Sequence, residues 1–532
     1  MKNRFLSLSA LILAAVLAFG GCASSADPGK ESRTDAAESI PPKESQTTAQ
    51  TEPETDPETE SETEANMKIP TGTKGQNPII STLFTADPSA HVFGDRLYIY
   101  ASHDVFPSRG CDLMDKYHVF STTNMVDFED EGEILSSADL SWGAEGFMWA
   151  PDCAQKDGKY YFYFPHPDDT ENWNSTWRCG VAVSDSPAGG FRDAGRLKNS
   201  AGGFVGQADG TGNDYGSMID PCVFQDTDGS YYLFIGGGAR LYYAKLADDM
   251  LSLAEPLKRV PDEQCPDYHE GSWVFKRGDT YYLMYADNEP GGNCMRYSTA
   301  KSVNGPWTYG GVFLSPVRDC DTTHGSICEF KGQWYLFYHN AALSGNGTLR
   351  SVCIDKIEFA PDGSILPVVQ TEEGVDAVGE RVLVSPSKGC IASITDEAAL
   401  SLYTDVKTYR ASSFDYGGGC NFNGTAIENL HLQGSWFEVN GVNGGNGGRA
   451  LVTVYYATQD TCATALVHST GDKSGDGYFL AMRGNGSWSD YTAKATLLVD
   501  LNPGSDNSIR FTCGMFGVNV AKVTVAVIPA KS

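Results

Sequence analysis

The sequence predicts an all-β protein, and a repeated pattern is the first observation behind that prediction. Five times a glycine turn is followed by a short aromatic strand, in segments 94–100, 158–163, 229–234, 278–285 and 332–338. Spacings of roughly 50 to 70 residues are typical of propellers and arrays, in which each unit buries its faces against its neighbours. We therefore expect a five-bladed β-propeller over residues 77–377.

The second observation is the strand pattern of the rest of the chain. Short aromatic and β-branched runs alternate with Gly, Asp and Asn turns, and helical periodicity is weak. From residue 408 to 529, runs such as 450–456 and 507–511 predict a second unit, whose length fits a β-sandwich of the jelly-roll type. Residues 378–407 are harder to interpret, and we expect a connector.

The first 22 residues predict an export signal. Lys2 and Arg4 precede an apolar run over residues 6–18, and small residues then lead to Cys22. This ending resembles a bacterial lipobox, which implies that Cys22 is lipidated after cleavage. We therefore expect an extracellular protein that is lipid-anchored to the bacterial cell membrane. A plain cleaved signal with an incidental cysteine is the alternative.

Residues 23–76 are rich in Ser, Thr, Pro and Glu. Such a composition cannot bury enough apolar surface to fold, so we expect a disordered acidic tether. The net charge of −29 argues against nucleic acid and anionic membrane surfaces as partners, and favours a neutral substrate. Any membrane contact is therefore expected through the lipid anchor alone.

The fourteen cysteines show no CxxC pair and no zinc-binding spacing. Cys153, Cys222, Cys328 and Cys353 stand inside strand-like segments, where they are expected to act as small buried apolar residues. One or two disulfides remain an alternative.

One polar residue interrupts an apolar stretch six to nine residues before each repeat glycine. These residues are Asp87, Asp152, Asp220, Glu270 and His324. In a radial arrangement they would converge on one axis. Glycoside hydrolysis needs one protonated and one ionised carboxyl group, about 5 Å apart for retention and about 6.5 to 9.5 Å apart for inversion. A third acid can keep the proton donor protonated near neutral pH.

The sequence around these acids resembles glycoside hydrolase family 43. The motifs, in chain order, are Ala86-Asp87-Pro88, Trp149-Ala150-Pro151, Ile219-Asp220-Pro221 and His269-Glu270-Gly271. The closest resemblance is to members that remove arabinose from arabinoxylan or cleave xylosides. It implies an inverting mechanism with Asp87 as general base and Glu270 as general acid. Asp220 would raise the pKa of the acid and orient it.

The same resemblance assigns three further residues. Trp149 would line the floor of the pocket, Arg350 would touch the bound sugar, and His324 would lie beside a central calcium or water cluster. No cofactor is required, and a structural calcium is possible at His324. The alternative for His324 is a hydrogen-bonded core histidine. Asp152 is assigned a turn or packing role. Glu145 is a competing acid, for which a solvated loop is the simpler interpretation.

Segments 434–442, 486–488 and 517–520 of the second unit resemble carbohydrate-binding module family 6. The resemblance implies that Trp488 stacks on a sugar face and that Asn519 hydrogen-bonds to sugar hydroxyls. A core tryptophan and a turn asparagine are the alternative. Residues 409–413 read Tyr-Arg-Ala-Ser-Ser where the family has calcium-binding glutamates, which argues against a calcium ion there.

Together these features predict an inverting glycoside hydrolase that releases α-L-arabinofuranosyl residues from arabinoxylan or arabinan of plant cell walls. We expect it to act as a monomer. A β-xylosidase acting on xylo-oligosaccharides is the first alternative. A sugar-binding propeller lipoprotein without catalytic activity is the second, and the presence of all three acids argues against it.

Overall fold

The computed structural model describes residues 77–80, 83–105, 110–126, 128–212, 215–289, 292–379, 389–390, 404–432, 434–460, 462–472, 477–514 and 516–527. The expected signal with Cys22, the tether 23–76 and most of the connector 378–407 lie outside these ranges. The described residues form strands and three-residue 3-10 helices, so the all-β prediction is confirmed. In these ranges no apolar helix reaches the length of a membrane crossing.

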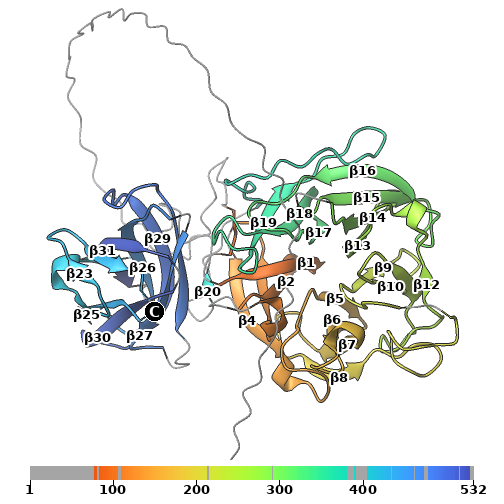
Figure 1. Ribbon diagram of the computed structural model, residues 1–532, viewed down its shortest axis with the longest axis horizontal. Coiled ribbons are helices and arrows are strands. Elements are labelled where there is room, and N and C mark those ends of the chain that lie inside the picture. Colours follow the sequence, from red (N-terminus) through yellow and green to blue (C-terminus); the bar gives the residue numbers. More distant parts are fainter. Residues whose placement is uncertain are drawn as a thin grey trace, which may run out of the picture. The chain divides into compact units, whose positions relative to one another are not determined.

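Five antiparallel sheets follow one another between residues 85 and 356 of the described chain (Figure 1). The first contains β1 (Thr85–Phe93), β2 (Arg96–His103), β3 (Lys116–Thr122) and β4 (Phe128–Ser136), with β20 (Gly389–Cys390) paired to β4. The second contains β5 (Asp152–Lys156), β6 (Lys159–Pro167), β7 (Trp177–Ser184) and β8 (Arg192–Arg196). The third contains β9 (Cys222–Gln225), β10 (Tyr231–Ile235), β11 (Tyr242–Lys245) and β12 (Lys258–Arg259).

The fourth sheet contains β13 (Glu270–Arg277), β14 (Thr280–Ala286), β15 (Met295–Ala300) and β16 (Thr308–Leu314), and the fifth contains β17 (Gly325–Phe330), β18 (Gln333–Asn340) and β19 (Ser351–Lys356). Short 3-10 helices lie between strands at Cys111–Leu113, Ser137–Asp139, Trp173–Ser175 and Asp262–Gln264, and a further one lies at Ala411–Ser413.

Each repeat is a hairpin turn followed by the second strand of a sheet. The aromatic segments lie in β2, β6, β10, β14 and β18, and each strand pairs with the strand before it. The five repeat glycines have φ values between 58° and 83°. Glycine adopts this left-handed conformation without steric cost, which explains why it recurs at each turn.

The first strands of the five sheets contact one another in a closed order. Strand β1 contacts β5, β5 contacts β9, β9 contacts β13, β13 contacts β17, and β17 contacts β1. Figure 1 shows these strands nearest the common centre of the sheets. The buried apolar clusters lie between neighbouring sheets, and one of them packs aromatic side chains of the first sheet, such as Tyr100, against those of the second, such as Phe162. The starts of the first strands are therefore brought together.

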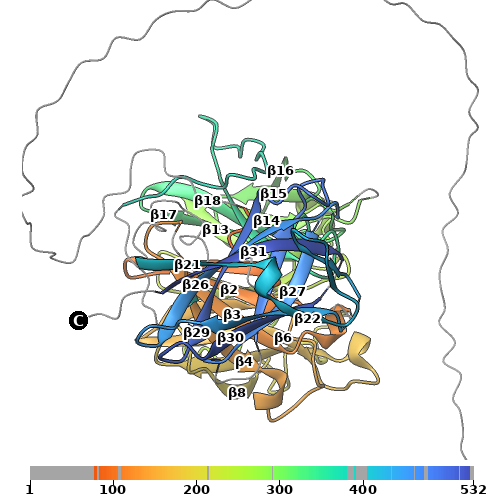
Figure 2. The same ribbon diagram turned by 90° about the vertical axis from the view of Figure 1, so that its left-hand side faces the viewer.

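The C-terminal unit consists of two sheets that share one core (Figure 2). One sheet contains β21 (Thr404–Arg410), β23 (Asn421–Phe422), β24 (Ile427–Leu430), β26 (Gly448–Ala457), β29 (Ala493–Leu501) and β31 (Val518–Val527). The other contains β22 (Asp415–Gly417), β25 (Trp436–Val442), β27 (Cys462–Ser469), β28 (Tyr478–Arg483) and β30 (Asn507–Cys513). The core draws Val452 and Val523 from the first sheet and the stacked rings of Phe437 and Phe511 from the second.

Candidate active site

The three predicted acids lie at the starts of three different first strands. Asp87 is the third residue of β1, where the pairing with β2 is interrupted. Glu270 is the first residue of β13, and Asp220 stands two residues before β9. His324, directly before β17, links two of them, because its Nδ1 is 4.0 Å from Oδ1 of Asp87 and 3.7 Å from Oδ2 of Asp220. The structure therefore gathers these predicted residues at one end of the first strands.

The backbone around the acids departs from regular strand geometry. Asp87 and Asp220 have φ values of 53° and 54°, a left-handed conformation that aspartate tolerates better than most residues. The pairing register shifts between Ala86 and Ser89, and again between Glu270 and Trp273. Such bulges change the direction of a side chain, which here turns carboxyl groups toward a shared space.

The Asp87 carboxylate is held by donors on both oxygens. Arg350 donates from Nη1 to Oδ1 at 3.1 Å, and the Ser102 hydroxyl donates to Oδ2 at 2.8 Å. Burial alone would raise the pKa of Asp87, but Arg350, His339, His324 and Ser102 together lower it to about 2. Asp87 is therefore ionised at neutral pH, as a general base must be.

His339 fixes the backbone of Asp87 and was not found by sequence reasoning. The N–H of Asp87 donates to Nδ1 of His339 at 3.1 Å, so the ring proton is on Nε2, which lies 3.1 Å from the carbonyl oxygen of Thr322. Burial and the charge of Arg350 lower the pKa of His339 to about 3, so the ring is neutral. The sequence feature that could have pointed to His339 is that it is a histidine inside the aromatic strand 333–340.

Asp220 and Glu270 have raised pKa values, in contrast to Asp87. Burial, followed by the charges of Glu270 and Asp87, raises the pKa of Asp220 well above its ordinary value. Burial also raises the pKa of Glu270, which the nearby His269 offsets only in part. The N–H of Gly271 donates to Oδ2 of Asp220 at 2.8 Å, which leaves this carboxyl fixed beside Glu270. The pair therefore retains a proton at higher pH than isolated carboxyl groups, as a general acid requires.

Arg350 is held in place by Asp104, a residue that the sequence did not predict. Its backbone N–H and its Nε donate to Oδ2 of Asp104 at 2.7 and 3.0 Å, and its Nη2 donates to Oδ1 at 2.8 Å. All these groups are buried. A bidentate contact of this kind fixes the guanidinium plane, so Arg350 reaches Asp87 from one direction. The position of Asp104 directly after the first aromatic strand was its only signal.

The surroundings of His324 do not fit a calcium site built from protein ligands. Calcium takes six to eight oxygen ligands. Of the neighbouring carboxylates, Asp87 already accepts from Arg350 and Ser102, and Asp220 accepts from Gly271. The guanidinium of Arg350 also adds positive charge at this place. The ring nitrogen of His324, 3.7 Å or more from both carboxylates, therefore does not complete an oxygen cage for calcium among the described residues.

Trp149 lies in a cluster of aromatic side chains. Its ring is 4.5 Å from that of Trp177 and 6.0 Å from that of Trp173, and its Nε1 donates to the Cys111 carbonyl oxygen at 2.8 Å. The hydroxyl of Tyr117, a residue whose pKa is raised by burial and by the charge of Asp87, donates to the Trp149 carbonyl oxygen at 2.6 Å. Tyr117 therefore connects the backbone of Trp149 to the surroundings of Asp87.

Asp152 bridges first strands instead of joining the acids. Its Oδ1 accepts from the Ser89 hydroxyl at 2.6 Å and lies 2.6 Å from Nε2 of His91, and its Oδ2 accepts from the N–H of Val223. These contacts tie β5 to β1 and β9. The other competing acid, Glu145, is exposed in a loop.

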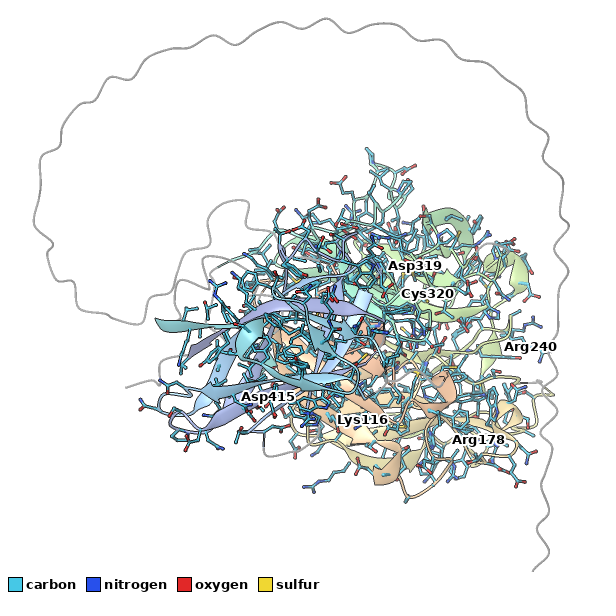
Figure 3. All side chains as sticks on the ribbon, turned by 60° about the vertical axis from the view of Figure 1, so that its left-hand side comes forward. Lys116, Arg178, Arg240, Asp319, Cys320 and Asp415 are labelled. Carbon is cyan, nitrogen blue, oxygen red and sulfur yellow. The ribbon has the colours of Figure 1, made fainter. Side chains whose placement is uncertain are left out.

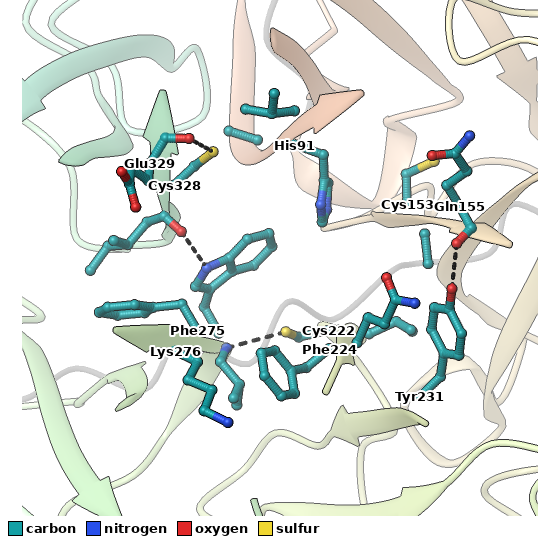
Figure 4. Close-up of a pocket in the computed structure, with 18 of the residues that line it drawn as sticks. His91, Cys153, Gln155, Cys222, Phe224, Tyr231, Phe275, Lys276, Cys328 and Glu329 are labelled. Atoms are coloured by element: carbon teal, nitrogen blue, oxygen red, sulfur yellow. Dashed lines mark hydrogen bonds between the residues drawn. The ribbon is translucent and has the colours of Figure 1, made fainter. Parts of the chain in front are cut away.

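A cavity of about 420 Å³ lies toward the other end of the same five strands (Figure 4). Its lining includes His91, Cys153, Cys222, Phe275 and Cys328, one from each of β1, β5, β9, β13 and β17. Cys153 and Cys222 are buried free thiols, as predicted, whereas Cys328 is only partly buried. The Sγ of Cys222 accepts the N–H of Val274 at 3.3 Å.

In the C-terminal unit, Trp488 and Asn519 are neighbours. Trp488 is 38% exposed, whereas Asn519 is buried. The side-chain amide of Asn519 donates to the carbonyl oxygen of Trp488 at 2.8 Å. Asn519 thus holds the loop that presents the tryptophan, and its side-chain nitrogen already has a partner.

Comparisons with known proteins identify the family of this chain. Residues 75–365 match the family described as Glycosyl hydrolases family 43. The "Xylosidase/arabinosidase 43A" of Humicola insolens is 36% identical over 345 residues, covering 54% of this chain and 98% of that protein. The "Beta-xylosidase" of Xylanibacter ruminicola is 32% identical over 331 residues, covering 54% and 97%.

Among solved structures, a GH43 beta-xylosidase/alpha-arabinofuranosidase from a compost microbial metagenome, in complex with xylotriose, shares 34% identity with this chain. It covers 55% of this chain and 97% of its own, with a TM-score of 0.48. The family match and the relatives show that the chain belongs to glycosyl hydrolase family 43. It is therefore a glycoside hydrolase that hydrolyses O-glycosyl bonds, and the alternative of a protein without catalytic activity is set aside.

Proposed function

We propose that the chain is an inverting pentosidase that releases α-L-arabinofuranosyl residues from arabinoxylan or arabinan. The observation that carries this proposal is the opposite protonation of its acids. Asp87, with its pKa of about 2, would accept a proton from water. Glu270, whose pKa is raised by burial, would donate a proton to the leaving oxygen. One ionised and one protonated carboxyl group is what glycoside hydrolysis needs, and the resemblance of the sequence motifs to the family adds the expectation of inversion.

The remaining residues would support these two. Asp220, buried beside Glu270, would disfavour a second negative charge in the pair, which would keep the acid from losing its proton early, and it would orient the acid. Arg350 would hold Asp87 and contact the sugar, and Trp149 would form part of the pocket floor. We also propose that the five sheets are the blades of a propeller whose axis carries the site, because their first strands contact one another in closed order. The mechanism uses no cofactor.

A β-xylosidase acting on xylo-oligosaccharides is the second candidate. It is favoured by the names of relatives that align along almost their whole length, "Xylosidase/arabinosidase 43A" and "Beta-xylosidase". Both substrates end in a pentose whose glycosidic oxygen must be protonated, so the same acids serve either reaction.

The test is turnover of nitrophenyl α-L-arabinofuranoside, nitrophenyl β-D-xyloside and xylobiose by the wild type and by Glu270→Gln. Loss of a general acid costs about 10²- to 10⁴-fold in rate. We expect a larger loss on xylobiose than on the nitrophenyl substrates, because nitrophenolate leaves without a proton. Glu145→Gln, at an exposed loop residue, is the control. Equal activity of Glu270→Gln and wild type on xylobiose would remove Glu270 from the mechanism.

The same assay separates the two candidates, since the ratio of kcat/KM for the arabinoside and the xyloside measures which pentose is preferred. NMR of the first-formed anomer tests inversion. A retained anomer would contradict the role of Asp87 as a base acting on water.

We further propose that the C-terminal unit is a β-sandwich that binds cell-wall polysaccharide through Trp488. The exposure of this ring supports the proposal, because flat apolar rings on a surface suit sugar faces. Trp488→Ala should lose retention on insoluble arabinoxylan while keeping wild-type turnover of nitrophenyl substrates. Unchanged retention would show that the polymer binds elsewhere.

The basic and apolar start of the sequence supports the proposal of an extracellular enzyme that is lipid-anchored to the bacterial membrane through Cys22. Mass spectrometry of the mature N-terminus should find Cys22 as the first residue with a lipid attached, and an unmodified cysteine would contradict the anchor. We also expect a monomer, which light scattering measures.

A further inference from the structure

Three neighbouring strands of the first sheet bring two histidines and a glutamate together. In the strand register His118 of β3 pairs with Ala101 of β2 and with Glu133 of β4. His103 lies two residues beyond Ala101 and therefore on the same face of the sheet. One potential ligand atom from each of His103, His118 and Glu133 lies within 4.8 Å of the others. Among the described residues, no other group of three or more His, Cys, Asp or Glu side chains brings its potential ligand atoms this close together.

The two histidines lack the hydrogen bonds expected of buried rings. His118 is 7% exposed, and neither of its ring nitrogens has a hydrogen-bond partner. The Nδ1 of His103 is also buried without a partner. The two rings meet edge to face, with their centroids 4.9 Å apart. Buried polar atoms are almost always hydrogen-bonded. For His118 the nearest partners are the carboxylates of Glu133 and Asp130, which lie beyond hydrogen-bond distance and whose charges, against the effect of burial, raise its pKa, and Nδ1 of His103 has no partner among the described residues.

We propose that His103, His118 and Glu133 bind a zinc ion. Oε1 of Glu133 is 3.6 Å from Nε2 of His118, which places a carboxylate beside the nitrogen that would hold the metal. On the other side of the ring, Oδ1 of Asp130 lies 3.9 Å from Nδ1. Histidine ligands of zinc commonly have a carboxylate at their second nitrogen, which orients the ring. Asp130 is in the position for that role.

The donor set selects zinc over calcium. Two imidazoles and one carboxylate suit a borderline metal ion, whereas calcium prefers oxygen alone. With Zn–N distances of about 2.0 to 2.1 Å, tetrahedral ligand atoms lie roughly 3.4 Å apart. A small side-chain shift would therefore close the site around the ion, and water would take the fourth position.

Lys116 is the group that competes with the metal. Its Nζ is 2.8 Å from Oε1 of Glu133, and Figure 3 labels it on the first sheet. The side chain of Glu133 is about half exposed, so it can exchange this ion pair for a metal bond. A bound ion would join β2, β3 and β4 one residue before Asp104, the residue that holds Arg350. Its effect would be to brace that segment.

The test is zinc binding to the full-length protein after removal of metal by a chelator. Free thiols elsewhere in the chain also bind zinc, so the readout is the difference between variants. Equilibrium dialysis against zinc should give one fewer bound ion, or an affinity lower by at least about tenfold, for Glu133→Gln and for His103→Ala. His431→Ala, at an exposed histidine of the C-terminal unit, should match the wild type.

Two further measurements make the result decisive. Cobalt, used in place of zinc, should give visible absorption of a tetrahedral nitrogen–oxygen site in the wild type and not in Glu133→Gln. Lys116→Met should tighten zinc binding, because the competing cation is removed. If Glu133→Gln and His103→Ala bind zinc and cobalt as the wild type does, the site does not exist. Glu133 is partly exposed, so its substitution leaves the fold intact for this comparison.

Discussion

The two ends of the five first strands differ in chemistry although the same strands form both. At one end Asp87, Asp220 and Glu270 gather with Arg350, and at the other a cavity is lined by aromatic rings and thiols. A single residue, Pro221, separates Asp220 from Cys222. The comparison shows that the repeated hairpins determine the arrangement of the strands, whereas the residues at the start of the first strands determine where the charged groups lie.

Within the charged end, one cation creates the difference between base and acid. Arg350 contacts Asp87 directly and helps to lower its pKa to about 2. Asp220 is as buried as Asp87, whereas the side chain of Glu270 is 21% exposed, and neither has such a contact with Arg350 among the described hydrogen bonds. Burial therefore raises the pKa of both. The three acids thus take two protonation states.

The largest expected effect comes from Asp87→Asn. The substitution removes the base while keeping a residue that tolerates the local φ of 53°. We expect kcat to fall by about 10²- to 10⁴-fold on all pentosides. Asp157→Asn is a matched control at the other end of the strands, because Asp157 has φ 52° and is exposed in the β5–β6 turn. If the kcat of Asp87→Asn stays within tenfold of that of the control, Asp87 is not the base, and the proposed difference between the two ends of the strands is contradicted.

The pH profile provides the second test. Because the pKa of Asp87 is about 2, the base stays ionised as pH falls and its protonation limits activity only near pH 2. The raised pKa values of Asp220 and Glu270 place the loss of activity on the alkaline side, where the pair gives up its proton.

Asp220→Asn should move that alkaline limb of kcat/KM to lower pH. The substitution removes a negative charge that favours the protonated form of Glu270, so the proton is lost earlier. Measuring kcat/KM against pH for variant and wild type checks this. An alkaline limb that stays in place or moves to higher pH would show that Asp220 does not tune the acid.

The smallest effect is expected at the cavity end. Cys222→Ala removes a buried sulfur that accepts the Val274 N–H, which costs about 1 to 2 kcal/mol of unfolding free energy. We expect a lower urea midpoint with kcat/KM within about twofold of wild type. Cys111→Ala, at an exposed cysteine, should leave both unchanged. A large loss of kcat/KM in Cys222→Ala would mean that the two ends are coupled.

Much of the charged end was predictable, because its acids follow local rules. Asp87, Asp220 and Glu270 each stand seven to nine residues before a glycine turn, and those turns proved to be hairpins with left-handed glycines. Asp104 and His339 were not predicted, since their roles depend on Arg350 and Asp87, residues about 250 positions away along the chain. Neither belongs to a local repeat.

By itself the sequence determined the strands, the five repeats and the acids, because period, turn chemistry and side-chain type are local properties of the chain. Only the tertiary structure decided which acid meets Arg350, where the cavity lies and that His103, His118 and Glu133 share one face. The physical reason is that burial and electrostatic contact depend on distance in space, and sheets bring together residues that no spacing in the sequence relates.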